Sequence, residues 1–140
     1  MQQLNAIEYT PLSPFPVTDS NNPRDNPDIM AESKKYQIIV SAYPQYVADQ
    51  SDPERDHYLF AYTIRITNSG TVAAQLISRH WIITDGELRV EEVRGLGVVG
   101  EQPLIRPGET YEYSSGCQLE TPVGTMRGNY QMVAEDGTTF

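Results

Sequence analysis

The sequence predicts an all-β protein folded as a β-sandwich, and three observations support this class. From residue 36 onward, apolar and polar side chains alternate with a period of two, which is typical of half-buried strands and not of helices. The alternating runs are short and are separated by turn sequences at a spacing of roughly 8–12 residues, as in sandwiches. Ten glycines and ten prolines among 140 residues also disfavour a helical bundle.

The clearest predicted strand covers residues 58–66, where every second side chain from Tyr58 to Ile66 is large and apolar. Similar alternation predicts further strands at residues 36–43, 74–84, 88–93, 109–117 and 126–134. The turn sequences between and after them are Asn68-Ser69-Gly70, Asp85-Gly86, Arg106-Pro107-Gly108 and Asp136-Gly137. Of these, Asp85-Gly86 predicts a two-residue hairpin with a type I′ turn, because that turn needs a positive φ at both central residues.

The first 33 residues differ in composition from the rest of the chain. They hold five of the ten prolines among Asn, Asp and Ser residues, with no apolar periodicity. Such a segment cannot bury enough apolar surface to offset its ordering entropy. We therefore expect a disordered N-terminal tail over residues 1–33 and one folded domain of ordinary size over residues 34–140.

The charge balance restricts the class of partner. Ten Lys and Arg residues stand against 19 Asp and Glu residues, for a net charge of −9 and a pI near 4.5. Residues 1–33 carry −4, Lys34 and Lys35 add +2, and the rest of the chain carries −7. Because binding to nucleic acid needs a basic face, we expect no nucleic acid among the partners of this protein.

Cysteine content and hydropathy indicate the compartment. The single Cys117 excludes an internal disulfide and every metal site built from several cysteines, and it suits a reducing compartment. The first ten residues lack the basic and apolar regions of a signal peptide, and no stretch approaches the ~20 apolar residues of a membrane span. We expect a cytoplasmic protein that makes no membrane contact.

A local motif near residue 107 has two interpretations. Pro107-Gly108 followed by Tyr111 resembles the tyrosine corner of some β-sandwich domains, in which the tyrosine hydroxyl bonds back to nearby backbone. The alternative is a plain turn followed by a strand on which Tyr111 is merely packed.

Several longer motifs occur in one order along the chain. They are QSDPE at 50–54, HYLFAYTI at 57–64, SRHWIITD at 78–85, EEVRGLGVVGEQPL at 91–104, PGE at 107–109 and TPVGTMRGNYQM at 121–132. Over about residues 36–140 the chain thereby resembles the ApaG family.

This resemblance implies an immunoglobulin-like, fibronectin type III-like β-sandwich with no enzymatic activity. Family members include small bacterial proteins linked to cobalt resistance and magnesium efflux, and the module also occurs at the end of some F-box proteins and in a DNA-polymerase-interacting protein. The family usually continues beyond the position of Phe140 with one more strand. Either the sequence is a fragment, or a sheet edge is left open that pairs in a homodimer or accepts a donated strand.

The segment from Gly95 to Gly100 matches the G-x-G-x-x-G pattern of dinucleotide-binding loops. That motif needs a following helix, which two β-branched residues and Pro103 exclude here. One remaining interpretation is a structural loop whose glycines serve positive φ angles or close packing. The other is an anion-binding concavity for phosphate or a nucleotide, lined by Arg94 with Arg79 and Arg127 and opposed by Glu91, Glu92 and Glu101.

Metal and catalytic sites have little support. His57 and His80 lie on different predicted strands, His57 as an exposed residue and His80 as a hydrogen-bonded one beside Trp81. The acidic residues Asp49, Asp52, Glu54 and Asp56 lack the spacing of a calcium loop and suit a solvated turn. Ser114-Ser115-Gly116-Cys117 lacks a nucleophile elbow, and a lone strand cysteine is by default a small buried residue. We expect no enzyme, no metal and no cofactor.

The function that we expect is protein binding, with a link to cation homeostasis that follows from the family resemblance. The expected surface combines the glycine-rich loop with the neighbouring strand: Arg79, His80, Trp81, Arg94, Gly95, Gly97, Gly100, Glu101 and Gln102. Substituting Gly97→Asp together with Arg94→Ala is expected to abolish partner capture and to leave thermal stability near that of the wild type.

Overall fold

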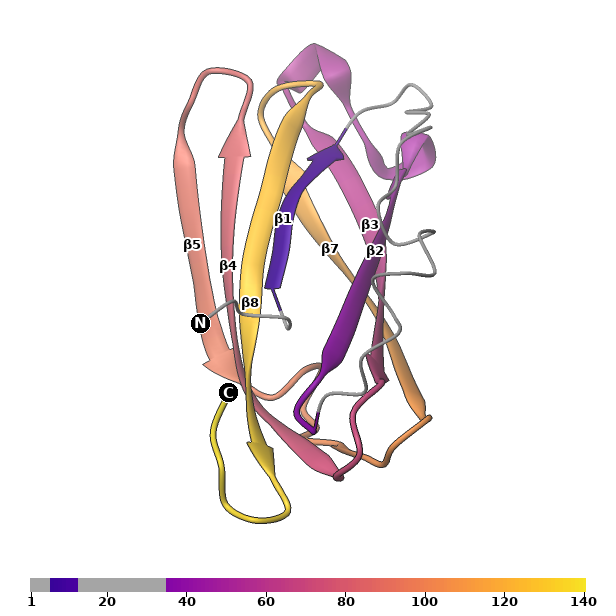
Figure 1. Cartoon of the computed structure of the whole chain (residues 1–140). Helices are drawn as coiled ribbons and strands as arrows, with labels where there is room; N and C mark the ends of the chain where they lie inside the picture. The colour runs from indigo at the N-terminus through magenta and orange to yellow at the C-terminus, as the bar shows by residue number, and fades with distance from the viewer. Residues whose placement is uncertain (1–5, 13–34) are drawn as a thin grey trace, which may run out of the picture.

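The computed structural model describes residues 6–12 and 35–140, with side chains for 11–12 and 35–140 (Figure 1). Its strands are β1 (Ala6–Leu12), β2 (Ile38–Tyr46), β3 (Tyr58–Asn68), β4 (Ala74–Asp85), β5 (Val90–Leu96), β6 (Leu104–Ile105), β7 (Thr110–Leu119) and β8 (Gly124–Ala134). Two short 3-10 helices, η3 (Ala48–Gln50) and η4 (Pro53–Arg55), join β2 to β3. Neither of these described helices could cross a membrane.

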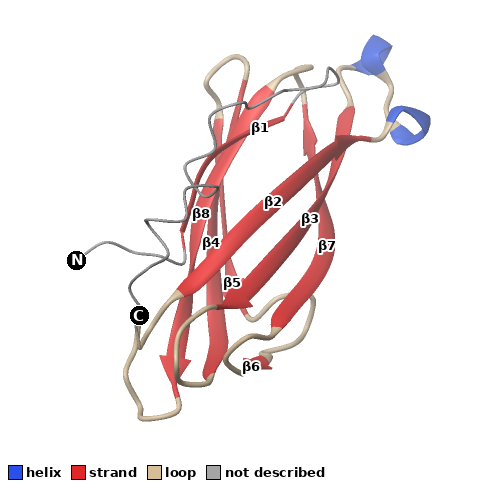
Figure 2. Ribbon diagram, turned by 45° about the vertical axis from the view of Figure 1, so that its right-hand side comes forward, coloured by secondary structure: helices blue, strands red, loops and turns tan. Residues whose placement is uncertain are grey.

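The strands form two antiparallel sheets that pack face to face (Figure 2). One sheet has the order β1-β8-β4-β5, with β6 beside the start of β4, and the other has the order β2-β3-β7. All six strands expected from the alternation are present, within a few residues of the predicted bounds. The predicted all-β sandwich is thus confirmed.

The core lies between the sheets and is made by every second residue of the central strands. Phe60, Ile64 and Ile66 of β3 are fully buried against Trp81 of β4 and Tyr130 of β8. Burial of each such side chain stabilises the fold by roughly 1.5–3 kcal/mol. The indole of Trp81 meets the Tyr130 ring edge-on, with the centroids 5.9 Å apart.

A buried hydrogen bond joins the two sheets across this core. The hydroxyls of Tyr113 in β7 and Tyr130 in β8 are 2.5 Å apart. Burial raises the pKa of Tyr113 to about 12, and burial together with Tyr113 also raises the pKa of Tyr130. Each hydroxyl supplies the other with the polar partner that a buried group needs.

Residues 6–12 correct the expectation of a disordered tail over residues 1–33. They form β1, which pairs with β8 from Ala6↔Asn129 to Leu12↔Gly124, and Leu12 is fully buried. Pro11 is exposed in this end strand of the sheet, where a missing N–H is tolerated. Residues 1–5 and 13–33 of the expected tail lie outside the described residues.

The edge of β8 that faces away from β4 is covered along its length. β1 pairs with residues 124–129, and the last residues of the chain fold back on the rest of the strand. Phe140 and Met132 exchange backbone hydrogen bonds of 2.9 and 2.8 Å, and the Ala134 N–H donates to the Thr138 carbonyl. In this sheet the other end strand is β5, at the left of Figure 1.

The turn between β4 and β5 is not the predicted two-residue type I′ turn. The Asp85 N–H donates to the Arg89 carbonyl, so three residues are enclosed, and Leu88 rather than Gly86 has a positive φ of 66°. The cause is the Asp85 carboxylate, which accepts the N–H groups of Glu87 and Arg89 at 2.9 Å each. This side-chain cap stabilises the longer turn.

Candidate functional site at the β5 edge

The segment Arg79-His80-Trp81 is divided between the two faces of β4. Trp81 is 2% exposed and belongs to the core, and Arg79 points to the same inner side. His80 lies on the outer face, between its cross-strand neighbours Arg94 of β5 and Asn129 of β8. The structure therefore does not bring these three side chains to one surface.

Arg79 holds the start of the glycine-rich loop. Its Nη1 donates to the carbonyl oxygens of Leu96 at 3.2 Å and Gly97 at 2.7 Å. The guanidinium lies over Gly95, where an added Cβ would come within 2.9 Å of both terminal nitrogens. A side chain at position 95 would therefore have to displace the Arg79 guanidinium.

The loop itself is a tight hairpin turn. Val98 and Glu101 exchange backbone hydrogen bonds of 2.8 and 2.9 Å, and the residues between them, Val99 and Gly100, have φ angles of 48° and 80°. Positive φ at both central residues is the signature of a type I′ turn. Gly97, with φ 62°, donates its N–H to the Ile77 carbonyl at 2.7 Å.

Side chains after the turn anchor it to the neighbouring strands. Gln102 Nε2 donates to the Ile77 carbonyl at 2.9 Å, and the Tyr111 hydroxyl donates to the Glu101 carboxylate at 3.0 Å. The hydroxyl of Tyr111 thus bonds to a side chain and not to backbone, so the tyrosine-corner interpretation was wrong. Pro107-Gly108 forms a plain turn, in which the Glu109 N–H donates to the Arg106 carbonyl.

These contacts favour the structural interpretation of the glycine-rich loop. The N–H groups of Gly97, Val98 and Glu101 are used within the protein, and the loop presents carbonyl oxygens, not N–H groups, to Arg79. A Cβ at position 97 would lie 2.1 Å from the Glu101 carbonyl oxygen. The expectation that Gly97→Asp leaves stability unchanged was therefore wrong.

The three arginines that were expected to converge also separate. Arg79 is on the inner side, whereas Arg94 and Arg127 lie on the outer face beside His80 and Ile82, respectively. The outer face has a hollow of about 430 Å³, and residues from three strands line it: Ser78, Arg79, His80, Arg94, Gly95, Leu96, Asn129 and Gln131.

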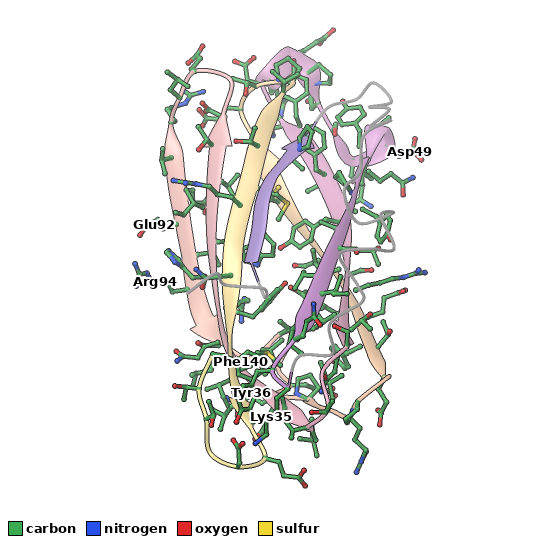
Figure 3. The ribbon with its side chains drawn as sticks, viewed as in Figure 1. Lys35, Tyr36, Asp49, Glu92, Arg94 and Phe140 are labelled. Carbon is green, nitrogen blue, oxygen red and sulfur yellow. The ribbon has the colours of Figure 1, made fainter. Side chains whose placement is uncertain are left out.

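His80 differs from the hydrogen-bonded residue that was expected. Its Nε2 lies 3.8 Å from Glu92 Oε1 and has no hydrogen-bond partner among the described residues. Glu92 Oε2 also lies 3.7 Å from Arg94 Nη2. Figure 3 shows Glu92 and Arg94 on β5, both pointing away from the sandwich.

Exposed apolar side chains gather around β5, which sequence reasoning missed. Five of the seven large hydrophobic residues that are exposed in the described part of the chain lie there: Leu88 (81%), Val90 (61%), Leu96 (75%), Val99 (64%) and Leu104 (48%). The sequence did contain an indication of this surface, because the alternation of apolar and polar residues fails between residues 96 and 104. Their concentration along one strand and its two flanking segments makes this edge the candidate interaction surface.

The outer backbone of β5 is also uncovered. Hydrogen bonds from Asp85 to Arg89 and from Gly97 to Ile77 show that odd-numbered residues of this region face β4. Because backbone groups alternate along an antiparallel strand, residues 90, 92, 94 and 96 present their N–H and C=O groups to the free side. We call these four residues, together with exposed Leu88, Val99 and Leu104, the β5 edge.

A second hollow, of about 320 Å³, opens between β5 and β7. Arg79, Glu91 and Val93 line one wall, and Tyr62 and Cys117 line the other. Burial, with the charge of Glu91, raises the pKa of the Cys117 thiol to about 11. Because the thiolate is the reactive form, Cys117 is a poor nucleophile at neutral pH.

The two histidines and the acidic residues do not form one cluster. His57 is exposed just before β3, in the other sheet from His80. The acidic segment from Asp49 to Asp56 forms η3, η4 and their flanks. Within the described ranges, no group of three or more His, Cys, Asp or Glu side chains could hold a metal ion.

Comparison with known proteins agrees with the motifs and the fold. The family model described as "DUF525: ApaG domain" matches residues 48–134. The chain is 71% identical to Protein ApaG of Thiobacillus denitrificans over 111 residues, 79% of this chain and 87% of that protein. It is 65% identical to Protein ApaG of Bordetella pertussis over 107 residues, 76% of this chain and 82% of that protein.

A solved structure gives the same result. The crystal structure of a protein from Bordetella pertussis, named ApaA, aligns with a TM-score of 0.77 at 64% identity, covering 78% of this chain and 89% of that one. Since the family model covers more than half of the chain and these relatives are closely similar, the chain belongs to the ApaG family.

Proposed function

We propose that the protein is a non-enzymatic, cytoplasmic protein-binding module that takes its partner at the β5 edge. The observation that carries this proposal is the gathering of exposed apolar side chains around a strand whose outer backbone groups face solvent. A partner strand added there would gain main-chain hydrogen bonds, and its side chains would be selected by the flanking residues.

The composition of β5 supports this proposal. Natural proteins protect free edges with prolines, bulges, inward charges or very short strands. β5 has one inward charge, Glu91, but it is seven residues long, contains no proline and pairs with β4 in unbroken register. Val90 and Leu96 are exposed at its ends, and burial of apolar surface contributes roughly 25 cal/mol per Å².

Val99 gives independent support. A β-branched residue is unfavourable in the left-handed region, yet Val99 has φ 48° in a turn type that favours Asn at that position. Its side chain is mostly exposed, so core packing does not explain its presence. Strained residues of this kind concentrate at functional surfaces.

Phosphate or nucleotide binding by the glycine-rich loop has less support. Arg79 is engaged by loop carbonyls, and Arg94 points to the outer face with Glu92 beside it. We also propose that the family's link to cobalt and magnesium operates through the protein partner. The separate positions of His57 and His80 support this indirect route.

The experiment is affinity capture from the source cells with identification of bound proteins by quantitative mass spectrometry. Leu96→Asp places a charge on the β5 edge, and Val123→Asp is the matched control at an exposed apolar residue outside it. We expect Leu96→Asp to lose a protein that both the wild type and Val123→Asp retain. Equal capture by all three proteins would contradict the proposal.

A further inference from the structure

We propose that the strand for which the β5 edge is built is β5 of a second copy of this chain. The two copies would pair antiparallel about a two-fold axis through Val93 and join their β1-β8-β4-β5 sheets into one. This inference rests on the proposed function, since it names the partner of the same edge.

The backbone of β5 allows this pairing. With the axis at Val93, Glu92 lies opposite Arg94 of the second copy, and Val90 lies opposite its Leu96. These are the residues whose N–H and C=O groups face the free side, so each pair can exchange two hydrogen bonds. Val93 meets its own counterpart at the non-hydrogen-bonded position on the axis.

The outer face of the joined sheet is self-complementary. Glu92 of each copy lies opposite Arg94 of the other copy, so this pair occurs once on each side of the axis. Both side chains are more than half exposed in the single chain. Exposed Val90 and Leu96 form the flanking pairs. Opposite charges and apolar side chains directly across from each other stabilise an antiparallel pair.

The charge pattern also selects the register. An axis at Glu92 would place two carboxylates directly opposite each other, and an axis at Arg94 would do the same with two guanidinium groups. Like charges in that position are destabilising. Of these three axes, only the one at Val93 places Glu92 opposite Arg94.

On the inner face of the joined sheet, a second pair of opposite charges involves a residue of β4. Glu91 would lie opposite Gly95 of the second copy, and the space above Gly95 is filled by the Arg79 guanidinium of the same chain. Glu91 and Arg79 line the hollow beside β7, at different positions along it. The dimer therefore brings a carboxylate of one copy toward a half-buried cation of the other.

A charge exchange tests the pairing. The dimer dissociation constant is measured by analytical ultracentrifugation for the wild type, Glu92→Arg, Arg94→Glu and the variant with both changes. Each single change creates like-charge pairs and is expected to weaken the dimer by about tenfold or more, whereas the double change restores opposite charges and the affinity. If the double variant does not regain the dimer affinity of the wild type, the proposed pairing is overturned.

Cysteine cross-linking tests the axis without relying on those variants. In a Cys117→Ser background, Val93→Cys places two thiols at a non-hydrogen-bonded pair, where the Cα separation suits a disulfide. Leu96→Cys is the control, because the two copies of residue 96 would lie roughly 20 Å apart. We expect the Val93→Cys protein to form disulfide-linked dimers rapidly and the Leu96→Cys protein not to do so. Equal rates of cross-linking in the two proteins would overturn the inference.

The two proposals fail in distinguishable ways. A wild-type protein that stays monomeric at high concentration, with capture of another protein lost in Leu96→Asp, overturns the self-pairing and keeps the proposed function. A monomer that also shows no capture dependent on Leu96 overturns both. Circular dichroism of every variant confirms that the exposed substitutions leave the fold intact.

Discussion

Arg79 Nη1 donates a 2.7 Å hydrogen bond to the carbonyl of Gly97, and so a cation in the middle of β4 holds the loop that follows β5. Gly97 is buried, as is Val98 next to it, so the loop forms part of one end of the core. The arginine that the sequence suggested for phosphate binding therefore has a structural role in this protein.

The first prediction concerns this contact. Arg79→Met keeps most of the apolar stem and removes the donors, which leaves the carbonyls of Leu96 and Gly97 without that partner. We expect a loss of about 1–3 kcal/mol in the free energy of unfolding by urea. Arg106→Met, at an exposed arginine, is the control and should change it by less than about 0.5 kcal/mol. Equal effects would show that the contact is not stabilising.

Two glycines of the loop should respond differently to alanine. Both have positive φ, but a Cβ at Gly97 would meet the Glu101 carbonyl, whereas a Cβ at Gly100 meets nothing within 4 Å. Gly100→Ala should therefore cost only the backbone strain, about 1–2 kcal/mol. Gly97→Ala adds a backbone clash and should cost at least ~1 kcal/mol more in urea unfolding. A smaller effect at Gly97 would contradict this loop geometry.

The buried tyrosine pair predicts loss of stability at alkaline pH. The unfolded chain releases its tyrosine protons near pH 10, whereas burial raises the folded-state pKa of Tyr113 to about 12. The stabilisation is complete below about pH 10 and falls as the pH rises, by roughly 1.4 kcal/mol per pH unit for each such tyrosine. Urea unfolding at several alkaline pH values measures the slope. Tyr113→Phe should make it shallower, and Tyr43→Phe, at an exposed residue, should not.

The fold could be predicted where side chains alternate between core and solvent. The strand at residues 58–66 is the clearest case, because every second residue from Phe60 to Ile66 is buried. β6 has two residues and leaves no periodic signal. β1 was missed because its place depends on pairing with β8, more than a hundred residues away. The Asp85 turn was missed because a carboxylate, and not a backbone dihedral preference, determines it.

The site could be predicted only in part. Period two already implies that Arg79 and His80 face opposite sides of their strand, so their separation was available from the sequence. The free edge was not, because strand order determines which strand ends a sheet, and that order comes from contacts distant in sequence. The exposed apolar residues near β5 can be interpreted as a binding surface only once β5 is known to be the end strand of its sheet.

Cys117 should react slowly with alkylating reagents. Burial, with the charge of Glu91, raises its thiol pKa to about 11, which makes the reactive thiolate roughly a hundred-fold rarer at neutral pH than in an exposed cysteine. Glu91→Gln removes the charge and should speed iodoacetamide labelling, followed by mass spectrometry. Labelling of the native protein as fast as that of the urea-unfolded chain would contradict the burial of this thiol.

The last prediction separates stability from function at Val99. Replacing it with Asn supplies a residue that tolerates positive φ in a type I′ turn, so the free energy of unfolding should rise by about 1 kcal/mol. The same change removes an exposed apolar side chain from the β5 edge and should weaken partner capture. Val123→Asn, at an exposed valine outside that edge, should not weaken it. If the partner does not contact residue 99, the substitution should raise stability and leave capture unchanged. A Val99→Asn variant with higher stability and undiminished capture would therefore show that Val99 has no role in binding.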